Sequence, residues 1–326
     1  MGGLLARNEM LVALILVAFV ALTTIVDPNF FSISTLFDLT RNGLVIGIFA
    51  IGVLLVLISG GIDVSFTALA AFAMYATTKT LVEIGGGYHL VLAFLLAGGI
   101  GLLLGMINAF FVGTLRLPTL IVTLGTLSVF RGALLTFVGS QRITNVPPGM
   151  RDFSRAVLLR GTTEAGNFYR LQAAVLVLFA VVILTWFILY RTQLGRNIFA
   201  LGGSQEAASR IGIRVTRTQY FIYGYVGVLS GVAGIVHASL ARLADPFDLV
   251  GLELSVIAAV VLGGARLQGG TGTITGTLLG VALIVVINNS LITLGIPSTW
   301  QNVVIGALIL LGTGVPAWRQ RKERLA

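Results

Sequence analysis

The segment Gly60-Gly61-Ile62-Asp63-Val64-Ser65 places a carboxylate between two long apolar runs. An ionised side chain at the centre of a bilayer costs roughly 3 kcal/mol or more, so such residues usually face protein or water. Two glycines relax the helix before Asp63, whose side chain can then accept hydrogen bonds from free N–H groups that begin the next helix. A broken membrane helix is tolerated where it lines a cavity or is buried in protein. Asp63 is therefore predicted to cap a helix, to line the route of a polar solute, or to do both.

Uncharged polar side chains recur in the other apolar runs. They include Ser128, Asn289, Gln301 and Asn302. Such amides and hydroxyls often bond neighbouring helices, and packing is their default role. Because few of these groups are charged, they suit a neutral hydroxylated solute better than an ion, whose path usually shows carboxylates or arginines. The residues that we predict along a solute route are Asp63, Ser65, Asn108, Thr123, Thr126 and Asn288.

The composition indicates a polytopic helical membrane protein. Hydrophobic residues make up 56% of the 326 residues and charged residues only 10%, against about 25% in average soluble domains. Runs of about 20 apolar residues, which span a bilayer as a helix, recur from end to end. We therefore predict an all-α membrane protein with ten spans, the eighth of them short, at 10–26, 43–59, 64–82, 89–113, 117–138, 171–190, 219–241, 253–264, 272–290 and 300–317.

The net charge of +9 is attributed to membrane topology rather than to nucleic-acid binding. All but two of the 21 basic residues are arginines, and many lie in short loops between apolar runs, as the positive-inside rule describes. The absence of cysteine excludes disulfides and thiolate metal sites. His89 and His237 are far apart and flanked by apolar residues, so we expect interfacial or packed histidines and no metal site.

An even number of spans puts both ends of the chain on one side of the membrane. The tail 319–324 is basic, so both termini are predicted to be cytoplasmic. Loop 191–218 then lies inside, while loop 139–170 lies outside although it carries five arginines, which the rule disfavours. The first apolar run is followed by Asp27-Pro28-Asn29 rather than by a small-residue cleavage site, which predicts a retained helix.

Small residues spaced four apart predict close helix packing rather than a solute site. The three ladders are Ala97, Gly101 and Gly105; Gly227 and Gly231; and Gly272, Gly276 and Gly280. Segments 107–118 and 287–297 each begin Ile-Asn and end in an apolar-Pro pair. With the first Pro inside and the second outside, the fourth and fifth spans are predicted to be an inverted copy of the ninth and tenth. The chain is thus one transmembrane domain, 1–326, with halves at about 1–138 and 171–326.

The segment from Arg191 to Arg217 predicts a short helix exposed at the membrane surface. Ser204 is a good N-cap, Glu206 follows in the first turn where it suits the helix dipole, and Gly212 can end the helix in a left-handed conformation. These signals place a helix at about 205–211, on the predicted cytoplasmic side. A helix so defined between two membrane halves favours docking of a soluble partner.

The sequence contains no Walker-type phosphate-binding loop, which needs Gly-Lys followed by Ser or Thr. Lys79 follows Thr78 and Lys322 follows Arg321, so neither lysine fits. If ATP drives this protein, a partner subunit must bind it, and this chain holds no cofactor. No clustered acid, base or nucleophile lies deep in the spans, so we expect no catalytic residue and no enzyme activity.

Four ordered blocks resemble the permease subunits of carbohydrate-importing ABC transporters, in the ribose/xylose/arabinose branch. They are SGGIDVS (59–65), PTLIVTLGTLSVFRG (118–132), GRNIFALGGSQEAASRIGI (195–213) and LELSVIAAVVLGGARLQGGTGTITGTLLG (252–280), and the resemblance covers nearly the whole chain. Phe66-Thr67 stands where Val-Gly is typical of the branch. A branch that imports autoinducer-2 shows a similar GGID-x-SF pattern, so the motif does not identify the transported solute.

The resemblance implies a homo- or heterodimeric permease in the bacterial inner membrane, two cytoplasmic ATP-binding subunits and an extracytoplasmic solute-binding protein. ATP hydrolysis by the partner would switch the permease between outward- and inward-facing states. The helix near 205–211 resembles part of the coupling loop of ABC importers, and the residues implied in coupling are Arg196, Ser204, Glu206, Arg210 and Gly212. The alternative is an ion-coupled secondary transporter of a small polar solute, which would usually carry more ionisable residues in its spans than Asp63 alone.

Overall fold

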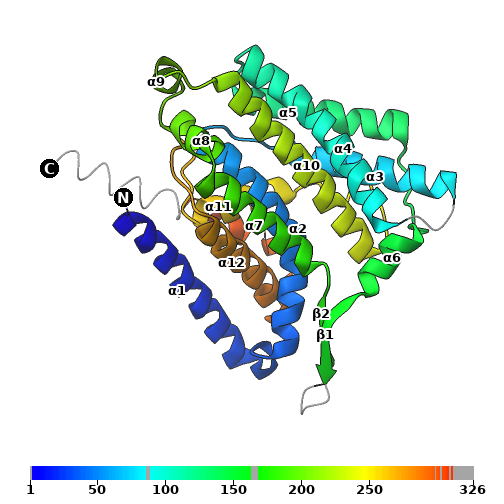
Figure 1. Ribbon diagram of the computed structural model, residues 1–326. Coiled ribbons are helices and arrows are strands. Elements are labelled where there is room, and N and C mark those ends of the chain that lie inside the picture. The colour runs from blue at the N-terminus through cyan, green and yellow to red at the C-terminus, as the bar shows by residue number, and fades with distance from the viewer. Residues whose placement is uncertain are drawn as a thin grey trace.

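Long apolar helices make up most of the structure, which is a computed structural model (Figure 1). It describes residues 2–85, 89–162, 168–297, 299–301, 303–307 and 310, with side chains from residue 9 onward. The longer helices are α1 (Gly2–Val26), α2 (Ile33–Ile58), α3 (Phe66–Ile84), α4 (Leu90–Ala109), α5 (Thr119–Ala133), α7 (Val175–Arg191), α10 (Val215–Ala241), α11 (Leu252–Leu262) and α12 (Ile274–Thr293). The π-helical turns Phe110–Thr114 and Leu134–Val138 extend α4 and α5.

Each of the first nine predicted spans overlaps a helix, but the predicted count of ten is not confirmed. Six described helices are long and apolar enough to cross a membrane, or seven if the bent pair α7 and α8 (Gln193–Gly203) is one span. The helix α3 falls outside this set because three threonines, Lys79 and Glu83 dilute its apolar residues in its second half. The helix α11, at 11 residues, is as short as predicted. The tenth span and the basic tail fall largely outside the described residues.

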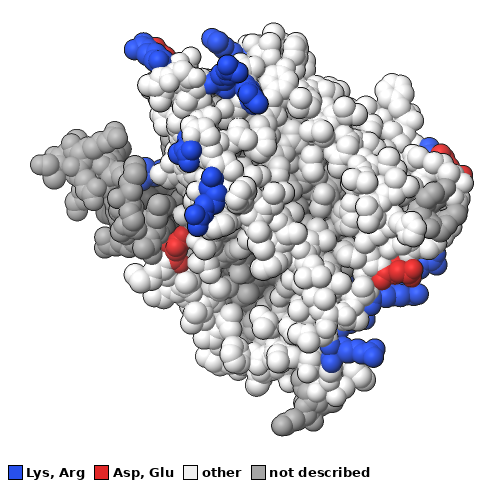
Figure 2. Space-filling model, in the orientation of Figure 1, with Lys and Arg blue, Asp and Glu red and all other residues white. Residues whose placement is uncertain are grey.

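The helix α2 forms the centre of the bundle and α1 lies at its edge. Of the 18 consecutive residues that are most apolar in α2, 78% are buried, whereas only 11% are buried in the corresponding segment of α1. The helices α10, α11, α12 and α7 all pack on α2, whereas α1 packs mainly on α12. The outward faces of α1, α4, α5 and α7 expose large apolar side chains such as Leu103 and Ile121. Figure 2 shows the matching surface, with a broad uncharged band between charged groups at its two ends.

The glycine ladders lie where the backbones of two helix pairs touch. A Cβ atom on Gly101 would fall on the carbonyl oxygen of Gly227, and one on Gly227 would fall on that of Gly101. Gly231 meets Ala97 in the same way, so the first and second ladders join α4 to α10. In the third ladder, Gly276 and Gly280 contact the carbonyls of Gly263 and Ala259 and join α12 to α11. Such contacts give helices in lipid the van der Waals packing that holds them together.

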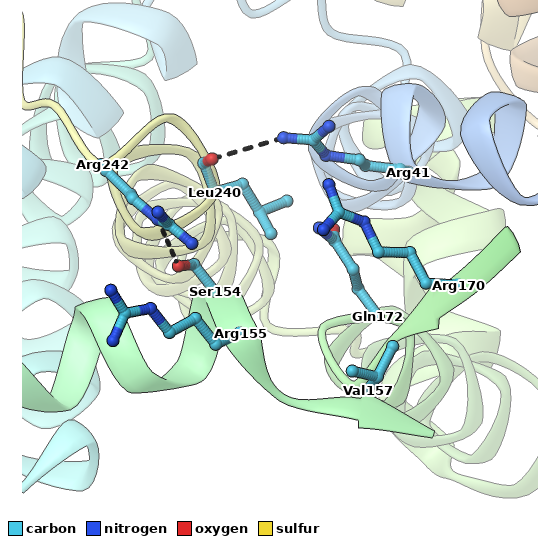
Figure 3. Close-up of a pocket in the computed structure, with 8 residues that line it drawn as sticks. All are labelled: Arg41, Ser154, Arg155, Val157, Arg170, Gln172, Leu240 and Arg242. Carbon is cyan, nitrogen blue, oxygen red and sulfur yellow. Dashed lines mark hydrogen bonds between the residues drawn. The ribbon is translucent and has the colours of Figure 1, made fainter. Parts of the chain in front are cut away.

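The predicted outer loop 139–170 is largely ordered secondary structure. It contains α6 (Pro148–Arg155) and an antiparallel hairpin of β1 (Val157–Thr162) and β2 (Phe168–Gln172). Pro147 and Pro148 start α6, because proline suits the first helical turn. The hairpin and α6 lie beside the ends of α2 and α10, around a pocket lined by four arginines (Figure 3). The sequence prediction placed no helix or strand in this connection, because short exposed strands lack a buried alternating face.

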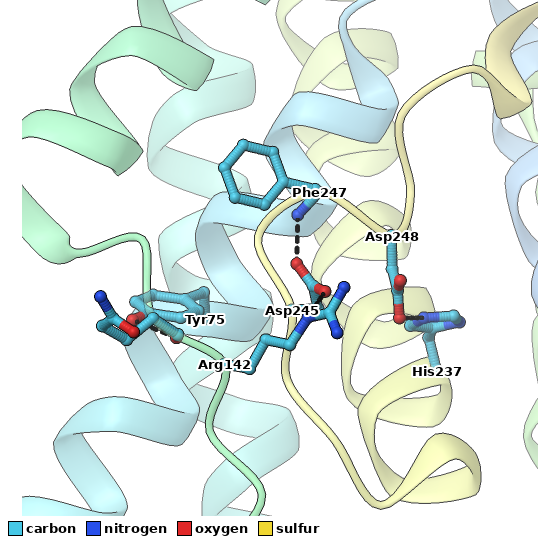
Figure 4. A network of polar contacts seen from close by, with 7 residues as sticks. Tyr75, Arg142, His237, Asp245, Phe247 and Asp248 are labelled. Carbon is cyan, nitrogen blue, oxygen red and sulfur yellow. Dashed lines mark hydrogen bonds and ion pairs between the residues drawn. The ribbon is translucent and has the colours of Figure 1, made fainter.

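A polar network ties the start of this segment to the connection after α10 (Figure 4). Ile143 and Ala244 form a β-bridge. The Arg142 guanidinium donates to Asp245 at 2.6 Å, and Asp245, only 1% exposed, also accepts from the backbone N–H of Phe247. His237, predicted to be a packed or interfacial residue, lies 3.4 Å from Asp248. These contacts hold the two connections together at the end of the bundle remote from α9 (Gln205–Arg210).

The contact between α4 and α10 can be tested by substitution. We expect Gly101→Ala to destabilise the protein by about 2 kcal/mol or more, because the added methyl group forces two backbones apart. Gly99, on the same helix, has nothing within 4 Å of its Cβ position and provides the matched control. Gly99→Ala should stabilise α4 slightly, by about 0.5 kcal/mol. Thermal unfolding in detergent measures both, and equal behaviour of the two variants would contradict the packing assignment.

Candidate functional site

The break between α2 and α3 follows from the glycines in the sequence. The helix α2 ends at Ile58, and Gly60 adopts a left-handed φ of 85°, which costs glycine little. The N–H groups of Gly60 and Gly61 bond back to the carbonyls of Leu57 and Val56. A Cβ on Gly61 would press on Thr119 of α5 at 3.1 Å. The chain can therefore turn in a tightly packed space before α3 begins at Phe66.

Asp63 lies in this break and is 1% exposed. Its Oδ1 accepts hydrogen bonds from the backbone N–H and the hydroxyl of Ser65, both at 2.7 Å. Ser65 directly precedes α3 and makes no capping bond with its own side chain. Asp63 thus makes a capping contact of the kind that the sequence predicts, on the residue that starts the helix. Its second oxygen, Oδ2, is buried without a hydrogen-bond partner among the described residues.

Asn108 extends the network from α4. Its Nδ2 donates to the Ser65 hydroxyl at 2.8 Å, so the bonds run from Asn108 to Ser65 to Asp63. Asn108 is 0% exposed, and its Oδ1 also lacks a partner in the part of the chain that the structure describes. A buried acceptor without a donor costs about 1–3 kcal/mol. Two such oxygens in one network are suited to accept hydroxyl groups of water or of a solute.

The α5 residues predicted for the route lie beside the break. The hydroxyl of Thr123 donates to the carbonyl of Ile62 at 3.2 Å, and Thr126 lies one turn further along the helix with its hydroxyl 3.4 Å from the Thr123 carbonyl. Both are buried. Tyr223 of α10, which is 1% exposed, reaches Thr119 at 3.3 Å. Sequence reasoning missed Thr119 and Tyr223 because neither stands out from its apolar surroundings.

Asn288 does not join this network. It lies near the end of α12, which packs on α1, α2 and α11. Its backbone carbonyl accepts a 3.4 Å hydrogen bond from Gln301, and its side-chain oxygen is buried without a described partner. The structure therefore brings together five of the six predicted route residues and places the sixth in a separate part of the bundle. The position of Asn302 lies outside the described residues.

The two residues that depart from the family pattern are integrated into the packing of α3. The ring of Phe66 lies 5.0 Å from that of Phe49 on α2, between centroids. The hydroxyl of Thr67 bonds the carboxylate of Glu253 in the first turn of α11. A valine and a glycine at these positions would make neither contact. Phe66 and Thr67 therefore change the contacts of α3 with α2 and α11 close to Asp63.

The predicted short helix is present as α9 at one end of the bundle (Figure 1). Its N-cap is Ser204, whose hydroxyl accepts from the N–H of Ala207 at 3.2 Å, and Gly212 follows it with φ 89°. Arg210 pairs with Glu206 at 2.6 Å, and both side chains are more than 75% exposed. The prediction of a single loop at 191–218 was incomplete, because α8 occupies 193–203. Arg196 lies on α8, bonded to Gln193 at 2.6 Å.

A surface hollow of about 550 Å³ adjoins α9, between α8 and the start of α10. Its lining includes Asn197, Gly212, Arg217 and Phe221, together with Ile211, which is 76% exposed. Ile211 and the nearby basic side chains give this end of the molecule a mixed apolar and basic surface. Of the predicted coupling residues, Gly212 lines the hollow directly.

The helix α8 also touches the end of α2, and this links the exposed α9 to the break at Asp63. The carbonyl of Ile58 accepts from the N–H of Gly270 at 2.9 Å, and a Cβ on Gly202 would fall on the same carbonyl. Gly269 abuts Gly60 with a positive φ of 91°. Four glycines from three separate segments therefore meet around one backbone carbonyl. Only residues without a side chain allow backbones to approach this closely.

Comparison with known proteins places the chain in a transport family. Residues 35–312 match the family described as branched-chain amino acid transport system / permease component. The chain belongs to this family. It is 34% identical to the autoinducer 2 import system permease protein LsrC of Enterobacter sp. (strain 638), over 99% of this chain and 90% of the relative.

The ribose import permease protein RbsC is similar at comparable levels. The identity is 35% for RbsC of Bacillus subtilis (strain 168), over 90% of this chain and 87% of the relative. It is 33% for RbsC of Escherichia coli (strain K12), over 97% and 95% respectively. No solved structure matches the chain. These relatives confirm the resemblance to import permeases, and they give the ion-coupled alternative no support. The chain is a multi-pass membrane protein and a transport subunit.

The role of Asp63 can be separated into capping and charge. Asp63→Asn keeps an oxygen that accepts from Ser65, so we expect it to retain most uptake. Asp63→Leu removes the acceptor and leaves the Ser65 N–H unbonded, which should lower stability by about 1–3 kcal/mol and abolish uptake. Solute uptake and thermal unfolding measure the two effects, with Ser128→Ala on the exposed face of α5 as control. Loss of uptake in the Asn variant at unchanged stability would show that the charge itself is needed.

Proposed function

We propose that this chain is the membrane-spanning subunit of an ATP-driven importer for a monosaccharide or a similar small hydroxylated solute. The observation that carries the proposal is its similarity, over nearly its full length, to permeases named for ribose and autoinducer 2 import. The network of Asp63, Ser65 and Asn108 supports it, because its two unpaired oxygens suit hydroxyl donors. A neutral solute also agrees with the scarcity of charge inside the bundle.

In this proposal the other components are separate chains. Cytoplasmic ATP-binding subunits supply the energy, an extracytoplasmic solute-binding protein delivers the solute, and a second permease subunit, identical or related, completes the membrane part. The absence of a Gly-Lys-Ser/Thr segment from the sequence supports an ATPase on another polypeptide. The protein resides in the bacterial inner membrane, with α9 and both termini on the cytoplasmic side.

The coupling that we propose runs from α9 to the break at Asp63. An ATP-binding subunit seated on α9 and the adjoining hollow moves α8, which is bent by 74° from α7 and so can shift as a separate arm. Movement of α8 presses Gly202 on the Ile58 carbonyl at the end of α2. Because Gly60 and Asp63 follow within five residues of Ile58, the same movement alters the network around Ser65 and Asn108.

Purification from the native membrane tests the proposal directly. An affinity-tagged chain should bring an ATPase subunit with it, and uptake in intact cells should require that subunit. Competition among ribose, other pentoses, hexoses and autoinducer-2 then identifies the solute class. A stable preparation that transports solute without any ATPase would refute the proposal.

The docking role of α9 predicts the effect of a double substitution. Glu206→Lys with Gly212→Ala should cut uptake at least tenfold, because it reverses a charge at the start of α9 and strains the turn that ends it. Membrane insertion should be unchanged, since α9 lies outside the bundle. Glu83→Gln, which removes an exposed carboxylate remote from α9, is the control and should transport normally. Full uptake in the double variant would exclude α9 as a docking element.

The glycine contact between α8 and α2 gives a second test with a matched pair. Gly202→Ala would place a methyl group on the Ile58 carbonyl, so α8 must move away from α2. We expect uptake to fall at least tenfold while ATP hydrolysis by the assembled complex persists. Gly203 has nothing within 4 Å of its Cβ position, so Gly203→Ala should behave like the parent protein. Equal uptake in the two variants, with both equally stable, would remove this contact from the coupling route.

A further inference from the structure

A cavity of about 530 Å³ lies at the end of the bundle remote from α9, and four arginines line it (Figure 3). They come from four separate elements: Arg41 from α2, Arg155 from α6, Arg170 from β2 and Arg242 from the end of α10. In the view of Figure 3, Arg41 and Arg170 approach the cavity from one side and Arg155 and Arg242 from the other. Among the described residues that line it, none is acidic.

The four positive charges are not neutralised by carboxylates within the described part of the chain. The ion pairs found there join other residues. Two of the four guanidinium groups have neutral acceptors: Arg242 donates to the Ser154 hydroxyl at 2.9 Å, and Arg41 donates to the Leu240 carbonyl at 3.4 Å. Like charges gathered around one cavity repel one another, and the attraction of each arginine to a bound anion would offset that repulsion.

Backbone strain and a buried amide mark the same cavity. Arg242 has a left-handed φ of 53° at the end of α10, a position that glycine usually takes. Gln172, which lines the cavity and is 7% exposed, has a side-chain oxygen without a described partner. A half-turn of its amide would present two N–H donors instead.

The hairpin beside the cavity has the character of a membrane interface. Arg160 lies directly opposite Arg170 across the two strands, a like-charge pair that is unfavourable without an anion. The same strands expose Leu158 and Leu159, and Phe168 is 84% exposed. Apolar side chains that stand beside arginines suit the boundary between lipid tails and the phosphate groups of the headgroups.

We propose that this arginine cavity binds the phosphate group of an anionic ligand, with a phospholipid headgroup as the source that the exposed hairpin favours. The planar guanidinium fork matches the geometry of phosphate oxygens and binds them through paired hydrogen bonds. The bound lipid would hold α2, α6, the hairpin and the end of α10 together. This inference concerns a site separate from the solute route and does not depend on which solute is imported.

The test compares two double variants of the full chain that lose the same charge. Arg155→Gln with Arg170→Gln removes two cavity arginines whose side chains make no described hydrogen bond, so folding should be preserved. Arg151→Gln with Arg116→Gln is the control, because neither residue lines the cavity. Each protein is reconstituted in phosphatidylcholine with phosphatidylglycerol and extracted gently. Native mass spectrometry then counts the retained phosphatidylglycerol.

We expect the parent and the control to retain phosphatidylglycerol and the cavity variant to retain about tenfold less or lower still. A second experiment compares the thermal unfolding of each protein in inorganic phosphate with its unfolding in chloride at equal ionic strength. Stabilisation by phosphate of the parent alone, without lipid retention, would support the same site with a soluble phosphate as its source. Arg155→Lys with Arg170→Lys keeps the positive charge but loses the planar guanidinium groups. It should give a loss of retained phosphatidylglycerol between those of the parent and the glutamine variant. Equal lipid retention and equal phosphate response in all variants would overturn the proposal.

Discussion

The carbonyl of Ile58, at the end of the buried half of α2, is the group on which the turn toward Asp63 and the contact with α8 depend. The last carbonyls of a helix have no partner within it, and Ile58 is fully buried, away from water that could supply one. Here the N–H of Gly270 supplies it, and Gly202 comes close enough to touch the same oxygen. One backbone group thus fixes where α2 stops, where the chain turns toward Asp63, and how α8 rests on the membrane part.

Much of the helical architecture could be predicted from the sequence, because apolar runs and glycine spacing act locally. The first nine predicted spans overlap α1 to α5, α7 and α10 to α12, and the three small-residue ladders lie at helix contacts. The cap at Ser204 and the turn at Gly212 could also be predicted, since each depends on residues a few positions away. The number of membrane crossings stays a prediction, because α3 is less apolar than the other long helices, α7 and α8 are bent against each other, and the tenth span lies largely outside the described residues. The inverted repeat stays a prediction.

The candidate site was predictable in its residues but not in its connections. Asp63 and Ser65 stood out because carboxylates and adjacent glycines are rare in apolar runs. Nothing local indicated that Asn108, 43 residues further along, would bond Ser65, or that Asn288 would lie elsewhere. The glycines of the 268–272 connection, which support the break, could not be assigned to it either. Such contacts depend on how helices cross, and that information is spread over the whole chain.

The backbone-to-backbone contact of α4 with α10 has a mechanical consequence. Carbonyl oxygens and glycine Cα atoms that already touch leave no gap through which one helix could slide or rotate against the other. The two helices therefore resist movement against each other along the length that they share. A rearrangement of the molecule is expected to carry α4 and α10 together as one unit.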